Sequence, residues 1–261
     1  MTVVSVIIPV YNAEKTVQKA LQSVAAQDFA ESVEIVLTDD GSTDASLETV
    51  NRFLQQHQIP HIIISQKNSG VSKARNEAMK KATGKYFAFL DADDEWLLDK
   101  LETQIGMMEE LELDFLAAKR TNQQILYPYR VSENGLAEIT FPKLLIRNEV
   151  HPSTVIISRK VTEKTGMFDE KQRYAEDVNY WMRISEHHRM YILDKPLVFA
   201  GGGKRTFGVS GLSANLKLMD QGFRKNLHDM YKAGRLSYPK LQFYRFFYRL
   251  KYFVLTLRSK M

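Results

Sequence analysis

The stretch Phe87-Ala88-Phe89-Leu90-Asp91-Ala92-Asp93-Asp94 decides the fold. Four apolar residues, typical of a buried strand, lead directly into three carboxylates within four positions. Alternate side chains of extended backbone share a face, so we expect Asp91 and Asp93 to point the same way. Asp94 then points away and caps a helix that begins at Trp96. Converging carboxylates repel each other unless a cation lies between them. The run therefore predicts either a Mg²⁺ or Mn²⁺ site shared with a substrate phosphate, or a solvated acidic turn.

Strand and helix signals alternate on both sides of this run. The predicted strands are residues 3–8, 33–37, 62–64, 86–90 and 115–118. The predicted helices are residues 16–26, a segment capped by Ser42 or Asp44 that runs to about 58, then 71–82 and 96–111. Such alternation indicates βαβ units, and apolar strands are typical of a parallel sheet covered on both faces. The first half therefore predicts an α/β fold.

Polar residues follow the other strands of this half as well. They are Pro9-Val10-Tyr11-Asn12, Asp39-Asp40-Gly41-Ser42 and Asn68-Ser69-Gly70. Ligands of open α/β sheets bind beyond the carboxyl ends of the strands. The helix that starts after Gly70 presents N–H groups suited to an anion, with Lys73 and Arg75 nearby. The alternative is a set of ordinary turns and helix caps.

The second half is less regular. Residues 154–158, 190–193 and 197–200 are predicted strands, and residues 177–186 are a predicted helix. Gly201-Gly202-Gly203-Lys204-Arg205 is either a hinged lid or a mobile solvated loop. We expect one catalytic domain over residues 1–213, with a nucleotide-binding half at 1–100 and an acceptor half at 101–213. Residues 214–261 are then a helical extension.

Composition limits the function classes. The absence of cysteine excludes a disulfide scaffold, a thiolate zinc site and a cysteine nucleophile. The N-terminus is typical of a first strand rather than a signal peptide. No apolar run approaches the ~18 residues that span a bilayer. These features lead us to expect a cytoplasmic enzyme, attached peripherally, if at all, to the inner face of the cytoplasmic membrane.

The charge is concentrated at the C-terminus. From Arg224 onward there are ten Lys/Arg and one acid, a net +9, which leaves −4 for residues 1–223 of the total +5. Residues 243–253 mix aromatic and basic side chains. One interpretation is contact with an anionic membrane; the other is packing on the domain or on a second subunit. The acidic body argues against nucleic acid as a partner.

These motifs, in this order and spacing, resemble the family 2 glycosyltransferases of the GT-A fold. The resemblance is dense over residues 1–100 and continues through residues 166–170 to Glu176-Asp177, with Trp181 and Arg183. It implies a mixed Rossmann-like sheet flanked by helices. It also implies a bacterial enzyme of surface polysaccharide synthesis.

The resemblance also implies a role for individual residues. Pro9 and Tyr11 would line the uridine pocket, and Asp39 would accept from the uracil N3–H. Gly70 and Arg75 would lie near the nucleotide. In the Asp-x-Asp motif, Asp93 would bind the metal directly and Asp91 would hold the ribose or sugar side. Asp177 would be the catalytic base.

The implied activity is inverting, metal-dependent transfer from a UDP-sugar to a hydroxyl of a lipid-linked glycan. One alternative is a nucleotidyltransferase, although the segment after the first strand lacks the glycine-rich basic loop of that class. Another is a non-catalytic nucleotide-sugar-binding module. The sugar, the acceptor linkage and the oligomeric state stay open.

Overall fold

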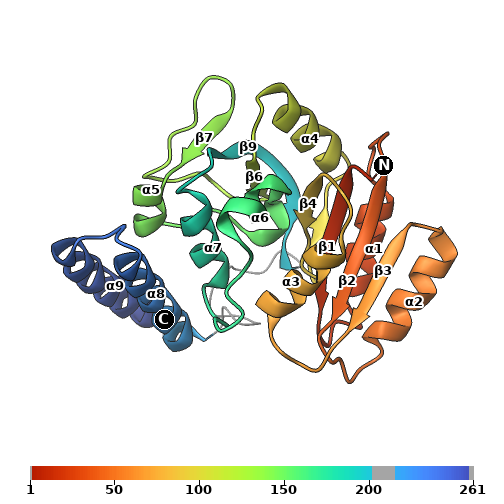
Figure 1. The fold of residues 1–261 in the computed structure, drawn as a ribbon, viewed down its shortest axis with the longest axis horizontal. Helices are drawn as coiled ribbons and strands as arrows, with labels where there is room; N and C mark the ends of the chain where they lie inside the picture. Colours follow the sequence, from red (N-terminus) through yellow and green to blue (C-terminus); the bar gives the residue numbers. More distant parts are fainter. Residues whose placement is uncertain (1, 202–214, 259–261) are drawn as a thin grey trace.

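A mixed β-sheet forms the centre of the computed structural model, which describes residues 2–201 and 215–258 (Figure 1). Within these residues, strands run in the order β3-β2-β1-β4-β8-β6-β9-β5, and β7 pairs with β9. Strands β1 to β4 are parallel to their neighbours in that set, whereas β8 is antiparallel to β4 and β6. The strands are β1 Val4–Val10, β2 Val33–Asp39, β3 His61–Ser65, β4 Tyr86–Phe89, β5 Glu95–Trp96, β6 Phe115–Arg120, β7 Leu136–Ile139, β8 Ile156–Ser158 and β9 Met190–Phe199. The predicted α/β fold with a mixed sheet is confirmed.

Helices cover both faces of the sheet, as the apolar strands require. Val6 and Ile8 of β1 pack with the core under α1, α2 and α4, while Ile7 between them packs with the core under α3, α6 and α7. The helices are α1 Val17–Ala25, α2 Ser46–His57, α3 Val71–Lys81, α4 Lys100–Glu110, α5 Phe141–Ile146, α6 Lys160–Thr165, α7 Glu176–Ile184, α8 Leu216–Lys232 and α9 Tyr238–Arg258. A 3-10 turn, η1 Pro152–Thr154, precedes β8.

Helix α7 is anchored by a buried tryptophan. Trp181 is fully buried, and its ring meets Phe115 of β6 edge-on at a centroid distance of 5.1 Å and Phe89 of β4 at 6.3 Å. Removing such a side chain costs about 3–5 kcal/mol because the cavity is not refilled. The helix is therefore held rigidly over the sheet, with its N-terminus beside the end of β4.

Several predicted boundaries were wrong. Trp96 begins no helix: its N–H donates to Ser23 Oγ, and it pairs with Val198 in the antiparallel β5–β9 ladder. The two strands predicted at 190–193 and 197–200 are one strand, β9, whose pairing with β6 shifts register near Lys119. The strand predicted at 154–158 opens as the turn η1. Local pattern does not reveal such partners from distant segments.

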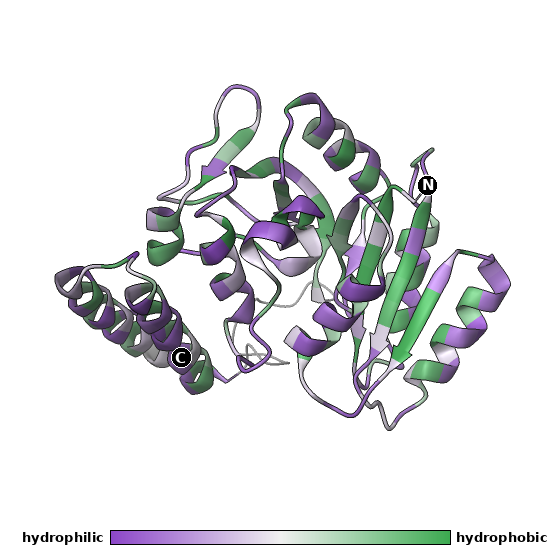
Figure 2. Ribbon diagram, viewed as in Figure 1, coloured by the Kyte–Doolittle hydropathy of each residue, from purple (hydrophilic) through white to green (hydrophobic). Residues whose placement is uncertain are grey.

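The C-terminal helices form an antiparallel pair beside α7 (Figure 1). The ribbon coloured by hydropathy in Figure 2 shows hydrophilic and hydrophobic residues interspersed along both helices. Helix α8 buries Leu227 and Met230 in the same core as α7, and α9 adds Leu241 and Tyr248. No helix in residues 2–201 or 215–258 is long and apolar enough to span a bilayer.

Candidate active site

The loops after β2 and β3 are locked together by Asp40. Its carboxylate accepts hydrogen bonds from the N–H groups of Ser69 (2.7 Å) and Gly70 (2.8 Å). Gly41, in the loop after β2, has φ +77°, and a Cβ there would lie 2.9 Å from the backbone nitrogen of Asn68 in the loop after β3. Glycine is therefore required for the close packing of these two loops. The Ser69 and Gly70 N–H groups, which precede α3, are therefore used by the protein itself, and the prediction that the N–H groups of the first turn of α3 bind an anion stays a prediction.

The loop after β1 is tied to the loop after β2. Asn12 adopts a left-handed conformation (φ +47°), donates its N–H to Ser42 Oγ and accepts from the Thr43 N–H. Asp39 is buried at the end of β2, and one of its oxygens accepts the Ser42 N–H at 3.1 Å. Tyr11 is half exposed on this framework. The rigid loops thus present the Tyr11 ring and the Asp39 carboxylate at the carboxyl edge of the sheet, where Pro9 is also partly exposed near the end of β1.

The acidic run is a turn rather than an extended strand. Strand β4 ends at Phe89, and the Asp94 N–H donates to the Asp91 carbonyl at 3.1 Å. Asp94 is buried, and its carboxylate accepts from Ser153 Oγ and from the Gly201 N–H (2.7 Å). The expectation that Asp94 points away and caps a helix was wrong, because the turn brings it back beside Asp91. Asp93 projects outward and is exposed.

This turn concentrates negative charge. Although the Asp93 side chain reaches the surface, partial loss of hydration within the turn, together with the Asp91 and Asp94 carboxylates, raises its pKa to about 6. Burial and the Asp91 carboxylate likewise raise the pKa of Asp94 to about 6. Burial lowers the pKa of His151 to about 4, so its imidazole is neutral at pH 7. The neutral imidazole leaves the Arg75 and Arg120 guanidinium groups as the positive charges that act on this acidic turn.

Asp91, Asp94 and His151 could hold a metal ion. Their ligand atoms all lie within 4.8 Å of one another. Two carboxylates and a neutral imidazole are donors suited to a divalent cation. A cation would offset both the loss of hydration and the mutual repulsion of the carboxylates that raise the pKa values of Asp93 and Asp94. The residues at this turn thus fit a metal, with Asp93 projecting from the same turn toward solvent.

Arg75 joins the acidic turn to α7. Its guanidinium donates to Asp91 Oδ1 at 2.7 Å and to Glu176 Oε1 at 3.1 Å, and it lies 5.3 Å from the centre of the Phe168 ring. The Arg75 side chain is 3% exposed. Burial disfavours ionisation of Asp91, but the Arg75 charge outweighs it and holds the pKa of Asp91 below its usual value. Arg75 therefore lies inside the site as a counter-ion rather than on its surface.

Asp177 lies in the first turn of α7, next to Glu176. Ala175 immediately before them has a left-handed backbone (φ +53°). Burial, reinforced by the Glu176 carboxylate, raises the pKa of Asp177 to about 7. The Val178 N–H and the Arg75 charge oppose that rise only in part. A carboxylate that titrates near neutrality is suited to accept a proton.

The structure thus brings Arg75, Asp91 and Asp177 to one edge of the sheet, with Pro9, Tyr11, Asp39 and Gly70 on the neighbouring loops. Reasoning from the sequence missed the contributions of Asp40 and Glu176 and gave Asp94 a different role. It left His151-Pro152-Ser153 open between a segment that faces the acceptor and a plain turn at the start of a strand. Two signals were available, because Asp40 and Glu176 are adjacent to carboxylates that were singled out. Of the suggested lid, Gly201 is described, and Gly202-Gly203-Lys204-Arg205 lie outside the described residues.

The chain matches the family model described as Glycosyl transferase family 2 over residues 5–157. It is 34% identical over 210 residues to an uncharacterized glycosyltransferase of Rickettsia felis, a match that covers 79% of this chain. The chain spans 34% of that relative's own length. The match to the family model includes the loops after β1, β2 and β3, the acidic turn and His151.

Two further comparisons carry more specific names. The chain is 32% identical over 183 residues to Escherichia coli WfgD, named UDP-Glc:alpha-D-GlcNAc-diphosphoundecaprenol beta-1,3-glucosyltransferase, with 69% of each chain covered. It is also similar to the crystal structure of S. aureus TarS 1-349 in complex with UDP-GlcNAc. That match has a TM-score of 0.71 and 25% identity, and covers 88% of this chain and 66% of the other.

Proposed function

The chain belongs to glycosyl transferase family 2, and from that premise we propose that it transfers a sugar from a UDP-sugar to a hydroxyl group of a lipid-linked glycan. The proposal includes inversion at the anomeric carbon and Asp177 as general base. Family membership favours this activity over a nucleotidyltransferase. A non-catalytic binding module would need neither a carboxylate with a pKa near 7, such as Asp177, nor an acidic turn.

One observation carries the proposal: a carboxylate with a pKa of about 7 is linked to the acidic turn through a single arginine. Asp177 follows Glu176, Glu176 binds Arg75, and Arg75 binds Asp91. The base and the turn are thus parts of one charged network at the edge where α/β sheets bind ligands.

For the donor, we propose that uridine stacks on Tyr11 beside Pro9 and that Asp39 accepts its N3–H. The half-exposed Tyr11 ring is available for stacking. The second oxygen of Asp39 receives no hydrogen bond from a described residue, since Ser42 uses only the first. TarS is named in complex with UDP-GlcNAc, and WfgD is named for a UDP-Glc donor, which supports UDP here.

The transfer itself is a single displacement. Asp177 accepts the proton of the acceptor hydroxyl while that oxygen attacks the anomeric carbon from the face opposite the diphosphate. The bond between the anomeric carbon and the phosphate oxygen breaks, and UDP leaves with the electron pair. The transition state has oxocarbenium character. Asp177 then releases its proton to solvent.

We propose that a divalent cation, Mn²⁺ or Mg²⁺, is held at the acidic turn. Asp93 and Asp91 are the ligands that the family motif implies, and Asp94 and His151 offer further donors next to them. When bound, such a cation offsets the negative charge of a diphosphate leaving group.

The proposed acceptor and location also start from membership of glycosyl transferase family 2. The name of WfgD specifies an undecaprenol diphosphate acceptor, which supports a lipid-linked glycan as the acceptor here. We therefore place the protein at the inner face of the cytoplasmic membrane, with residues 1–213 as the catalytic part and residues 214–261 as the membrane-facing extension.

A panel of UDP-sugars, assayed for UDP release with and without Mn²⁺, tests the function. The expected result is donor-selective, metal-dependent release that rises when a diphosphate-lipid glycan is supplied. Release of pyrophosphate from UTP and a sugar phosphate would establish the nucleotidyltransferase instead. UDP-sugar binding without turnover on any acceptor would establish the binding module.

A further inference from the structure

The outer side of α9 carries an apolar stripe that no described residue covers. Phe243, Phe246, Leu250 and Phe253 are 62%, 61%, 50% and 62% exposed, and Val254 beside them is 45% exposed. At about 100° per residue these five positions fall within roughly 100° of the helix circumference. The opposite side of α9 packs on the domain through Leu241 and Tyr248. Exposed apolar surface of this extent, in one continuous line, indicates a binding surface.

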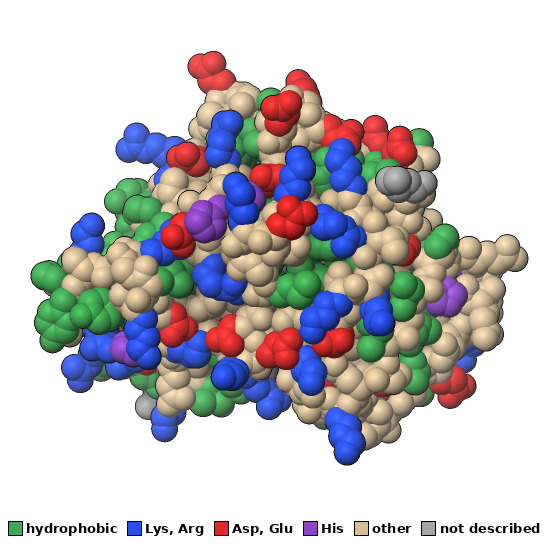
Figure 3. Space-filling model, in the orientation of Figure 1, with side chains coloured by type: hydrophobic (Ala, Val, Ile, Leu, Met, Phe, Trp, Pro, Cys, Tyr) green, Lys and Arg blue, Asp and Glu red, His purple; other side chains and the backbone are tan. Residues whose placement is uncertain are grey.

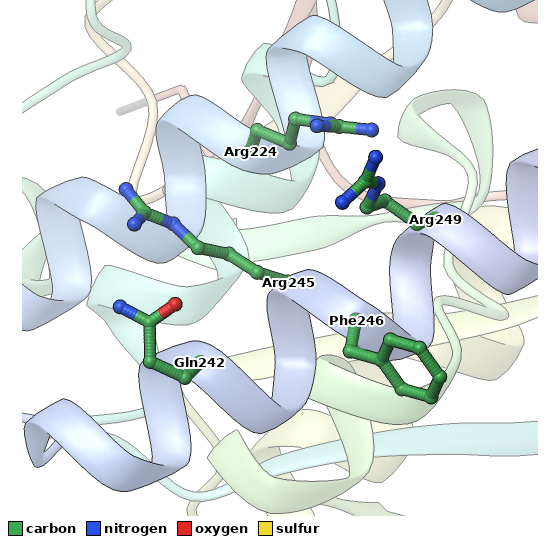
Figure 4. A pocket seen from close by; sticks show the side chains of 5 residues that line it. All are labelled: Arg224, Gln242, Arg245, Phe246 and Arg249. Atoms are coloured by element: carbon green, nitrogen blue, oxygen red, sulfur yellow. The ribbon is translucent and has the colours of Figure 1, made fainter.

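Arginines lie along one edge of this stripe. Arg224 of α8 lines a hollow of about 380 Å³ with Gln242, Arg245, Phe246 and Arg249 of α9. Figure 4 shows the guanidinium groups of Arg224 and Arg249 directed toward one another. Arg224 pairs with Asp220 at 2.7 Å, whereas Arg245 and Arg249 form no ion pair with any residue among 2–201 and 215–258.

All the charged residues of α9 are basic. Its sequence contains five Lys/Arg and no Asp or Glu. Figure 3 shows hydrophobic and basic side chains next to each other at the α8–α9 end of the molecule. The Arg224 and Arg249 guanidinium groups face each other with one acid, Asp220, beside Arg224, whereas the Arg245 guanidinium is directed away from them (Figure 4). The facing pair repel each other, so an anion bound there lowers the free energy of this arrangement.

We propose that this face, defined by Phe243, Phe246, Leu250 and Phe253 with Arg224, Arg245 and Arg249, docks on an anionic lipid bilayer. The apolar stripe enters the boundary between headgroups and acyl chains, and the arginines bind headgroup phosphates. Helix α9 lies in the plane of the surface, since no described helix can cross a bilayer. The inference deepens the proposed location by naming the surface and the lipid charge it requires.

Other occupants fit less well. A second copy of the chain would bring its own arginines to the same line of contact, where like charges repel. A nucleic acid would satisfy the arginines but offers no apolar layer for Leu250 and Val254. A bilayer with anionic headgroups satisfies the charge and the stripe together.

The test is flotation of the full-length protein with vesicles, without donor or acceptor. The probes are vesicles of phosphatidylcholine and vesicles of phosphatidylcholine with phosphatidylglycerol. Wild type should float with the second and much less with the first. Arg245→Gln with Arg249→Gln should weaken binding by about tenfold or more, from ~1 kcal/mol per basic residue. Phe246→Ser with Phe253→Ser should weaken it at least as much.

Lys19→Gln with Arg52→Gln is the matched control, because it removes the same charge from exposed positions on α1 and α2. It should float like wild type, and circular dichroism melting should show all three variants folded. Equal binding to both vesicles, no binding to either, or loss in the Lys19/Arg52 control would overturn the proposal. A dimer in ultracentrifugation, or capture of an oligonucleotide, in place of vesicle binding would overturn it as well. Donor turnover is not measured, so failure here leaves the enzymatic proposal to its own test.

Discussion

The Arg75 guanidinium lies 2.7 Å from Asp91 and 3.1 Å from Glu176, with its side chain 3% exposed. One buried cation thus pairs with two carboxylates, one 16 and the other 101 residues away from it in the sequence. The arrangement fixes the distance between the acidic turn and the N-terminus of α7. The Arg75 charge also holds the pKa of Asp91 below its usual value, while burial raises the pKa values of Asp94 and Asp177 beside it.

Replacing Arg75 should destabilise the fold strongly. Arg75→Met leaves Asp91 and Glu176 buried without a counter-ion, and we expect a loss of about 3–5 kcal/mol in the free energy of unfolding. Lys80→Met is the matched control, because Lys80 pairs with Glu77 while 47% exposed. Its loss should stay under about 1 kcal/mol. Urea unfolding at pH 7.5 measures both, and similar values for the two variants would contradict a structural role for the Arg75 network.

Asp177 should set the pH dependence of transfer. Its pKa of about 7 means that turnover should fall about tenfold per pH unit well below pH 7, as the base becomes protonated. Asp177→Asn should lower kcat by about 10²-fold or more and leave UDP binding close to wild type. The measurements are kcat against pH and calorimetric UDP titration. A flat profile from pH 5.5 to 8 would exclude Asp177 as the base.

The same pKa predicts an effect on stability. A carboxyl whose pKa rises from 3.8 to about 7 on folding binds its proton more tightly in the native state. Its contribution to stability is therefore complete below about pH 4 and is lost as pH rises toward 7. Asparagine at position 177 carries no titrating carboxyl, so stability no longer falls as the pH rises. Asp177→Asn should therefore raise the free energy of unfolding at pH 8 by about 1–3 kcal/mol relative to wild type. No gain is expected at pH 4, where both proteins are neutral at this position.

Metal binding should compete with protons at the acidic turn. Since the pKa values of Asp93 and Asp94 are about 6, Mn²⁺ affinity should fall severalfold between pH 7.5 and pH 5.5. Asp93→Asn and Asp94→Asn should each weaken Mn²⁺ binding in calorimetry by about tenfold or more. Glu48→Gln, an exposed acid on α2, is the control and should bind like wild type. EDTA should abolish transfer, and Mn²⁺ should restore it.

The sequence allowed the elements of the first half to be predicted, apart from β5 and the start of α4, because the predicted strands are apolar runs closed by polar residues. It did not reveal which carboxylates meet. Asp91 and Asp93 were expected to share a face by alternation, but the chain turns after Phe89, and Asp94 returns beside Asp91. The partners that cause this, Ser153 and Gly201, are 59 and 107 residues away. Similarly, nothing near Arg75 in the chain indicates Glu176. Long-range hydrogen bonds determine how the carboxylates of the site are arranged, whereas the local sequence pattern determines the strands and helices.

Helix α8 contacts the segment that presents the candidate base. Gly222 of α8 lies so close to Tyr174 that a Cβ at this position would clash with the Tyr174 carbonyl group. One turn further on, Asn226 donates to the Ala175 carbonyl at 2.9 Å, two residues before Asp177. Helix α8 therefore holds the segment that presents the base, although the sequence placed it in a separate extension.

Gly222→Ala should push α8 away from Tyr174 and lower both the free energy of unfolding, by about 1–3 kcal/mol, and kcat. The matched control is Gly106→Ala in α4, where an added Cβ meets no atom within 4 Å. Since alanine favours helix over glycine, that variant should gain about 0.5–1 kcal/mol and keep its kcat. Urea unfolding and steady-state kinetics distinguish the two. If Gly222→Ala behaves like Gly106→Ala, α8 does not support the base, and the helices beyond residue 214 act only at the membrane.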